Sequence, residues 1–395
     1  MSLRDLFPLQ AGVAYLNHGG LGVAPIPVVE ARERKLRSIE ADPTRFYMRE
    51  LDEAVAAPLT AVGEAVGAAP SDLCWVPNAT FGINLVARSL MGSLEPGDEV
   101  LLTDIEYGAQ VILWEWVCRQ RGATLRTVTV SGVAGAAAGG AGAAAEAAAD
   151  AVEAAVTPAT RIALISHITS ATALRLPAGQ ISRRLRALGV TVIVDGAHVP
   201  GHVPLDVAAV GCDYYVANLH KWFAAPRSSA FLHALGPAQA RLDPLVVSWG
   251  GTDRSEPLAR RVHFAGTTDP SPWLAVPDAL AFHRSVLSPA RPAARALLAG
   301  AAAGLADLGY ERIGRQDDDL LMSSFWLPAA TDPTRLAGRL VADRIEAIVT
   351  AHAGRPVLRV AVAWYTTEDE VDRLLSSCAA VGRAADKARR RSSLR

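Results

Sequence analysis

The stretch Thr191–Pro226, TVIVDGAHVPGHVPLDVAAVGCDYYVANLHKWFAAP, holds two apolar runs that each lead into polar residues. Asp195 closes the first run, and Lys221 follows the second. Continuous runs of Val and Ile are typical of strands in a parallel sheet that helices cover on both faces. A charged group at the end of such a strand is costly unless it meets an opposite charge. The stretch therefore predicts a parallel α/β sheet with a carboxylate and an amine near one edge.

The same alternation continues towards both ends of the chain. Further strands are indicated by apolar runs at residues 72–77, 97–104, 123–130 and 161–168. Helical patterns lie between the runs, at residues 78–90, 109–122 and 178–189. Strands that alternate with helices in this way favour a doubly wound α/β domain.

The pattern changes after about residue 265. Long helical segments follow, with a strand pair near 323–328 and 357–365, which is typical of a smaller α+β domain. We therefore expect an N-terminal arm over residues 1–20, a large domain over 21–265 and a small domain over 266–395.

Composition limits the classes of function. The chain has 39 Lys and Arg against 40 Asp and Glu, mixed along its 395 residues, so no nucleic-acid-binding face is expected. The four cysteines lie far apart without Cys-x-x-Cys spacing, which argues against a disulfide framework or a thiolate zinc site. No apolar stretch could span a bilayer and no secretion-type N-terminus is present, so we expect a cytoplasmic protein without a membrane partner.

One histidine pair has the spacing of a metal motif. His198 and His202 are four residues apart with Asp195 close by, an arrangement that could hold a metal on a helix. Pro200 and Gly201 lie between them and break the helix that this geometry needs. No metal site is predicted.

One cofactor explains Lys221 and Asp195 together. A lysine beside a buried strand end needs a partner or a depressed pKa, and its amine can then form a Schiff base. Pyridoxal 5′-phosphate offers an aldehyde to the lysine and a ring nitrogen that a carboxylate keeps protonated. The segment Asn78-Ala79-Thr80, where a strand passes into a helix, could bind its phosphate, and Tyr107 could stack on its ring. Taken alone, these last residues could equally be a helix cap and ordinary packing.

The chain resembles class V aminotransferase-fold enzymes, which are pyridoxal phosphate-dependent proteins of fold type I, close to the isopenicillin N epimerase-like branch that also holds C–S lyases of cysteine conjugates. The similarity covers nearly the whole length, in the motifs YLNHGGLGVAP (15–25), NATFGINL (78–85), EYGA (106–109), SHITSATALRLP (166–177), VDGAHVPGHVPLD (194–206), NLHKW (218–222), VVSWGG (246–251), GTTDPSPWLAVPDAL (266–280) and LRVAVAWYTTEDEVDRLL (358–375). The resemblance implies a mostly parallel sheet of the seven-stranded type between helices, a smaller C-terminal α+β domain, and a homodimer with active sites at the subunit interface.

The resemblance also implies roles for single residues. Lys221 would bind the cofactor's aldehyde carbon, Asp195 would hold its pyridine nitrogen, and His198 would lie near its phenolic oxygen. Tyr107 would stack on the ring, and Arg359 would bind the α-carboxylate of the substrate in a bidentate contact. The implied phosphate-binding residues are Asn78, Ala79, Thr80, Asn218, His220 and, from the second subunit, Thr267.

The reaction is less defined than the cofactor. Residues that would lie near the leaving side chain are His18, Tyr47, Arg49, Thr169 and Trp249. We favour β-elimination from an S-substituted cysteine conjugate in secondary metabolism, because of the resemblance to this branch and because Gly19-Gly20 and Gly250-Gly251 could leave room for a bulky substituent. An amino-acid epimerase and a decarboxylating oxidative deaminase are the alternatives on the same scaffold. A cofactor-binding regulator without turnover is the alternative of another class.

One reaction is expected to be excluded. Cysteine desulfurases need a nucleophilic thiolate to attack the substrate sulfur, in the loop before the carboxylate-binding arginine. The segment 347–360, AIVTAHAGRPVLRV, contains Arg359 but no cysteine. We therefore expect that the chain is not a cysteine desulfurase. Two further departures concern Asn218, where relatives commonly carry Ser or Thr, and Ser170, where desulfurase-like relatives carry Asn.

Overall fold

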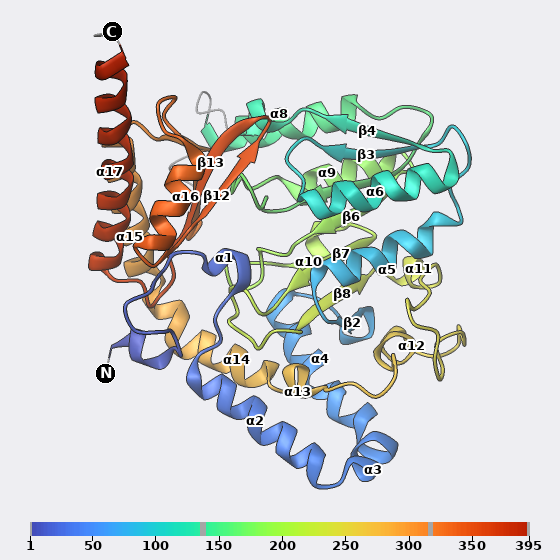
Figure 1. Cartoon of the computed structure of the whole chain (residues 1–395). Helices are drawn as coiled ribbons and strands as arrows, with labels where there is room; N and C mark the ends of the chain where they lie inside the picture. The colour runs from blue at the N-terminus through green and yellow to red at the C-terminus, as the bar shows by residue number, and fades with distance from the viewer. Residues whose placement is uncertain (1, 135–139, 315–318, 393–395) are drawn as a thin grey trace.

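The computed structural model describes residues 2–134, 140–314 and 319–392, and a seven-stranded sheet forms its centre (Figure 1). The strands in spatial order are β2 (Leu73–Val76), β8 (Ala230–Ala234), β7 (Tyr214–Asn218), β6 (Thr191–Asp195), β5 (Thr160–Ser166), β3 (Glu99–Thr103) and β4 (Thr124–Val128). β8 runs in the opposite direction to the other six strands. The predicted α/β fold with a mostly parallel sheet is confirmed.

Helices cover both faces of this sheet (Figure 1). Alternate residues of β6 point to opposite faces, as the two-residue period of a strand requires. Ile193 packs in the apolar core beneath α5 (Ala79–Met91) and α6 (Gly108–Arg121). Val192 and Val194 pack in the core on the other face, with α4 (Leu51–Val66), α8 (Gly140–Ala154) and α9 (Ala178–Ala187). Burial on both faces explains why β6 reads as an uninterrupted apolar run.

A smaller antiparallel sheet lies beside the large one. Its strands in order are β12 (Ile348–His352), β13 (Arg355–Ala361), β10 (Met322–Trp326) and β9 (Glu311–Ile313). The helices α15 (Ser288–Asp307), α16 (Pro333–Ala342) and α17 (Glu368–Ser392) lie along it (Figure 1). The predicted strand pair is confirmed, although β13 ends at Ala361 and does not reach residue 365.

The N-terminal residues join the small sheet's side of the molecule. β1 (Ala14–Tyr15) pairs in parallel with β11 (Ile345–Glu346), and Asn17 forms a bridge to Ala361. The helices α13 (Ser271–Leu274) and α14 (Val276–Phe282) instead pack against α2 (Ile26–Ala41) and α4. The domain boundaries at residues 20 and 265 stay a prediction. Within the described ranges, no helix combines the length and apolarity needed to cross a membrane.

Candidate active site

A cavity of about 380 Å³ opens at the carboxyl ends of the parallel strands. Ser166, Asp195 and Asn218, the last residues of β5, β6 and β7, all line it. This edge is where open α/β sheets bind their ligands. The predicted residues that the fold brings to this cavity are Asn78, Ala79, Thr80, Tyr107, Asp195, His198, Asn218, His220, Lys221 and Arg359.

Asp195 is buried at the end of β6 and is held from two sides. Its Oδ1 accepts a hydrogen bond from the backbone N–H of Ala197 at 2.9 Å, and its Oδ2 accepts one from Nε2 of Gln110 at 3.4 Å. Burial raises the pKa of this carboxyl, while the Ala197 hydrogen bond and the charge of Lys221 act in the opposite direction. A cationic ligand group beside Asp195 would favour the charged form of this carboxyl.

The amine of Lys221 lies 3.1 Å from Nε2 of His198. Burial lowers the pKa of Lys221 to about 7, although the carboxylate of Asp195 opposes this change. Burial, and then the charge of Lys221, lowers the pKa of His198 well below its usual value, so its neutral ring accepts a hydrogen bond from the amine. A large fraction of Lys221 is thus unprotonated at neutral pH, as a nucleophile or base requires.

The N-terminus of α5 forms another wall of the cavity. Asn78 caps the helix, because its Oδ1 accepts from the N–H of Phe81 at 2.9 Å. Asn218 Oδ1 accepts from the N–H of Ala79 at 2.9 Å and so ties the helix to the end of β7. Thr80 and His220 complete this wall. The helix dipole and the Thr80 hydroxyl make it suitable for an anion such as a phosphate.

These residues fit pyridoxal 5′-phosphate. A partly unprotonated lysine, a buried carboxylate and a helix N-terminus are the groups that its aldehyde, ring nitrogen and phosphate need. All three line one cavity. Within the described residues, no cluster of three or more His, Cys, Asp or Glu is placed to hold a metal ion.

Arg359 is buried in β13 and is fixed before any substrate arrives. Its Nη1 donates to the carbonyl oxygen of Ser170 at 2.8 Å and to the Ser170 hydroxyl at 3.0 Å, and its Nη2 donates to Oδ1 of Asn17 at 3.0 Å. Its Nε is buried without a hydrogen-bond partner. Burial lowers the pKa of Arg359 to about 10, which leaves the guanidinium charged at neutral pH. A charged planar group held in this way is suited to a substrate carboxylate.

We expect Arg359→Lys to raise KM, or the dissociation constant of an amino-acid ligand, by about 10- to 100-fold, because lysine keeps the charge but loses the planar fork. The rate constant kcat should change less, since the contact is made in the ground state as well. Steady-state kinetics or ligand titration of the cofactor's absorbance measures this. The matched control is Arg355→Lys, an exposed arginine of the same strand. Equal losses in both variants would contradict the assignment.

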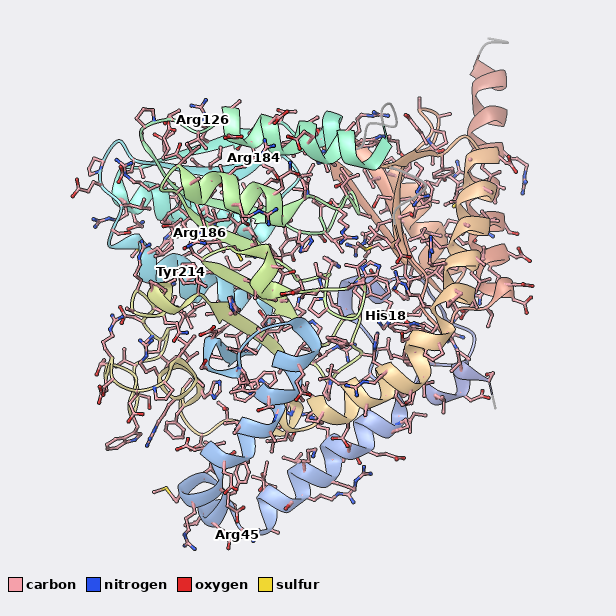
Figure 2. All side chains as sticks on the ribbon, turned by 180° about the vertical axis from the view of Figure 1, so that it is seen from behind. His18, Arg45, Arg126, Arg184, Arg186 and Tyr214 are labelled. Atoms are coloured by element: carbon pink, nitrogen blue, oxygen red, sulfur yellow. The ribbon has the colours of Figure 1, made fainter. Side chains whose placement is uncertain are left out.

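His18 and Thr169 are not brought to the cavity. His18 is fully buried, between the large sheet and the C-terminal helices (Figure 2). Its ring nitrogens lie 2.9 Å from the Tyr365 hydroxyl and 2.9 Å from the Lys221 carbonyl oxygen. Thr169 is buried too, and its hydroxyl bonds to Thr172 and accepts from the N–H of Leu174. In this protomer the polar groups of both residues bond within the fold, and the role expected for them near the substrate stays a prediction.

The other predicted substrate residues, Tyr47, Arg49 and Trp249, lie outside the cavity of this protomer, as does Thr267, which is predicted to bind the phosphate of the second subunit's site. Arg49 and Thr267 are exposed, and Trp249 is 85% exposed. The hydroxyl of Tyr47 donates to the Thr268 carbonyl oxygen at 2.7 Å. The roles suggested for these residues at a subunit interface stay predictions.

Several cavity groups were missed at the sequence level. Gln110 holds Asp195 and Asn17 holds Arg359, while Ser166 lines the cavity beside Asp195. Gln110 could have been found, because it follows Tyr107 by three residues and so lies on the same helix face. Asn17 had no such indication, since its partner is more than three hundred residues away in the chain.

Comparison with known proteins gives a family. The family model of class-V aminotransferases matches residues 15–374. The chain is 35% identical to an isopenicillin N epimerase of Streptomyces clavuligerus, over 94% of this chain and 95% of that protein. It is 33% identical to a putative L-cysteine desulfhydrase of Oryza sativa subsp. japonica, over 69% of this chain and 58% of that protein.

Solved structures share the fold. The cystine C–S lyase C-DES, in complex with its reaction product cysteine persulfide, matches with a TM-score of 0.81 and 24% identity, over 95% of this chain and all of that chain. The cysteine desulfurase CsdA from Escherichia coli matches with a TM-score of 0.76 and 22% identity, over 95% of this chain and 96% of that chain.

The exclusion of a cysteine desulfurase is wrong. Probable cysteine desulfurases of Mycolicibacterium paratuberculosis and Xylella fastidiosa are 28% and 24% identical over 80% and 95% of this chain, and CsdA shares its fold. The segment before Arg359 is not an open loop, because residues 348–361 form the hairpin of β12 and β13.

Proposed function

This chain belongs to the class-V aminotransferase family and uses pyridoxal 5′-phosphate, and we propose that it is an epimerase that inverts the Cα centre of an amino-acid substrate. The observation that carries the proposal is the pair of Lys221 and the neutral His198, which lie 3.1 Å apart. The pKa of Lys221 is lowered to about 7, and the same cavity is lined by Arg359. The 35% identity to an isopenicillin N epimerase over nearly the whole chain supports it over the C–S lyase that the sequence favoured.

The bound cofactor would supply an electron sink for negative charge at the substrate's Cα. Lys221 would bind its aldehyde carbon, Asp195 its ring nitrogen, and the N-terminus of α5 with Thr80 its phosphate. These three assignments follow from the chemistry of the cavity wall.

The protein's own groups would then move one proton. Arg359 binds the α-carboxylate and so orients the Cα–H bond. The amine of Lys221 takes the Cα proton, because its lowered pKa leaves it partly unprotonated at neutral pH. Inversion requires a proton to return to the opposite face, and we assign that step to the phenol of Tyr107, which lines the same cavity and acts electrostatically on Arg359.

The test uses isopenicillin N and a panel of L-amino acids in deuterated water. We expect deuterium at Cα together with a mixture of stereoisomers, followed by mass spectrometry and chiral chromatography. Tyr107→Phe should still exchange the Cα proton, through Lys221, while inversion falls by about 100-fold or more. Exchange and inversion that fall together in Tyr107→Phe would remove the two-group assignment. Release of thiol and pyruvate without inversion would contradict the epimerase.

C–S cleavage is the second candidate. It is favoured by the 33% identity to a putative L-cysteine desulfhydrase. The same Lys221 base would remove the Cα proton, and a sulfur substituent at Cβ would leave in place of reprotonation. L-cysteine and an S-substituted cysteine, assayed for sulfide, thiol and pyruvate, distinguish this reaction from epimerisation.

A homodimer completes the proposal. Leu21 and Tyr107 line the cavity and are nevertheless 58% and 46% exposed. A second subunit that covers this opening would exclude water from the reacting carbon and would bring its Thr267 to the phosphate.

A further inference from the structure

A second carboxyl lies behind the predicted cofactor site. Glu106 sits between the end of β3 and the start of α6, directly before Tyr107. Its Oε1 accepts hydrogen bonds from the Thr103 hydroxyl at 2.6 Å and from the Ser166 N–H at 3.0 Å. Its Oε2 accepts from the Ser166 hydroxyl at 2.5 Å. All three donors are neutral, so the network stabilises the carboxylate without an ion pair.

This network is connected to Asp195. Ser166 is the last residue of β5, and it pairs with Asp195 of β6 in the parallel register. The next residue, His167, donates its backbone N–H to the Asp195 carbonyl oxygen at 2.9 Å. Glu106, in the connection after β3, and Asp195, at the end of β6, are therefore linked through the end of β5, which lies between these two strands. Burial, and to a smaller extent the charge of Asp195, raises the pKa of Glu106 to about 7, although its hydrogen bonds act against this.

We propose that Glu106 is a positioning residue of the cofactor site: it fixes the end of β5 beside Asp195, and its negative charge strengthens the hold of Asp195 on a cationic ring nitrogen. The inference rests on the proposed role of Asp195. Two like charges at one sheet edge favour a positive group between or beside them, because such a group relieves their repulsion. Loss of the Glu106 charge would then weaken cofactor binding without touching the cofactor.

Glu106 is the group of this network whose protonation changes near neutral pH. Thr103 and Ser166 are neutral hydroxyl donors. Asp104 is next in the chain, but its carboxylate is bound by the backbone N–H groups of Val130 and Ser131 and by the Ser131 hydroxyl. Asp195 is the charged group that acts on Glu106, and Lys221 acts on Asp195 in turn. The charge of Glu106 therefore changes within the neutral pH range.

The test is the dissociation constant of pyridoxal 5′-phosphate for the apo protein between pH 6 and pH 9, without substrate. In the wild type we expect tighter binding as the pH rises through about 7. Glu106→Gln keeps the shape and loses the charge, so the dissociation constant at pH 8 should rise about tenfold, equivalent to one pKa unit of interaction. The change in affinity between pH 6 and pH 9 should become smaller by the same factor, and the part that comes from Lys221, whose pKa is also about 7, should remain. The visible spectrum of the bound cofactor gives an independent readout.

Glu99→Gln is the matched control. Glu99 begins the same strand, about 13 Å from Thr103, and its Oε2 accepts from the hydroxyls of Thr157 and Thr160. The Glu99→Gln variant should bind the cofactor as tightly as the wild type does. If Glu99→Gln loses affinity to the same extent, or if Glu106→Gln keeps the full pH-dependent change of the wild type, the proposal is overturned and that change belongs to another group such as Lys221.

Ser166→Ala provides a second variant should Glu106→Gln fold poorly. It removes a hydrogen bond that lowers the pKa of Glu106 and keeps the charge, so the step should move to higher pH. An unmoved step would contradict the proposal. Because no substrate is used, a protein that binds the cofactor as expected and does not epimerise would refute only the proposed reaction. A wild type that binds no cofactor would refute both.

Discussion

Lys221→Ala should lower the rate of the Cα reaction by at least about 10³-fold, because the variant lacks the base that takes the proton. It should also lose the absorbance band above about 400 nm that the cofactor shows when joined to a lysine. The physical reason is the environment of the amine. Lys221 is 9% exposed, its pKa is lowered to about 7, and it lies 3.1 Å from the neutral ring of His198. No other lysine in the described residues lines the cavity.

The control for this prediction is Lys35→Ala. Lys35 lies on α2 and forms a partly exposed ion pair with Asp278 at 3.5 Å, so its loss should leave the band and the rate unchanged. Absorbance of the purified proteins and the exchange assay measure both variants. A Lys221→Ala protein with the wild-type band would place the reactive amine elsewhere and would remove the basis of the mechanism.

The free energy of unfolding should fall steeply as the pH decreases from 7.5 to 5.5. Several buried histidines have lowered pKa values, to about 3 for His18 and well below the usual range for His198 and His202. Below pH 6.5 these histidines bind protons in the unfolded chain but not in the folded chain. Their contribution to the free energy of unfolding is therefore present above that pH and is lost below it. Each such histidine costs about 1.4 kcal/mol at one pH unit below its ordinary pKa.

The raised pKa of Glu106 acts in the opposite direction over part of this range, because its protonated form favours the folded state up to about pH 7. The histidines outnumber it, since His167, His220 and His263 have pKa values lowered to about 4, 4 and 3 as well. We expect a net loss of at least about 3 kcal/mol between pH 7.5 and 5.5, measured by urea unfolding of the apo protein. His202→Gln should reduce the slope. A flat profile would show that these rings take up protons in the folded state.

The sequence predicted the ends of strands well. Buried apolar runs lead directly to Asp195, Asn218 and Lys221. Another apolar run leads to Asn78, which caps a helix. These local patterns predict that all four residues lie at one edge of the sheet. The strand pattern at 357–365 predicted β13, whereas β12 falls in a segment that was expected to be a loop, because its pairing with β13 becomes visible only in the folded sheet. For His18 a motif shows the residue type and not the direction of its ring, which lies against the Tyr365 hydroxyl and the Lys221 carbonyl oxygen.

What the sequence determined by itself was the alternation of strands and helices, the class of fold and the residues at the strand ends. Each depends on periods of two or about four residues, which neighbouring positions reveal. The tertiary structure decided which groups support those residues. Gln110 reaches Asp195 across 85 positions, Ser166 reaches Glu106 across 60, and Asn17 reaches Arg359 across 342. Hydrogen bonds between side chains depend on spatial proximity, and at such separations only the packing of the two sheets and their helices creates it.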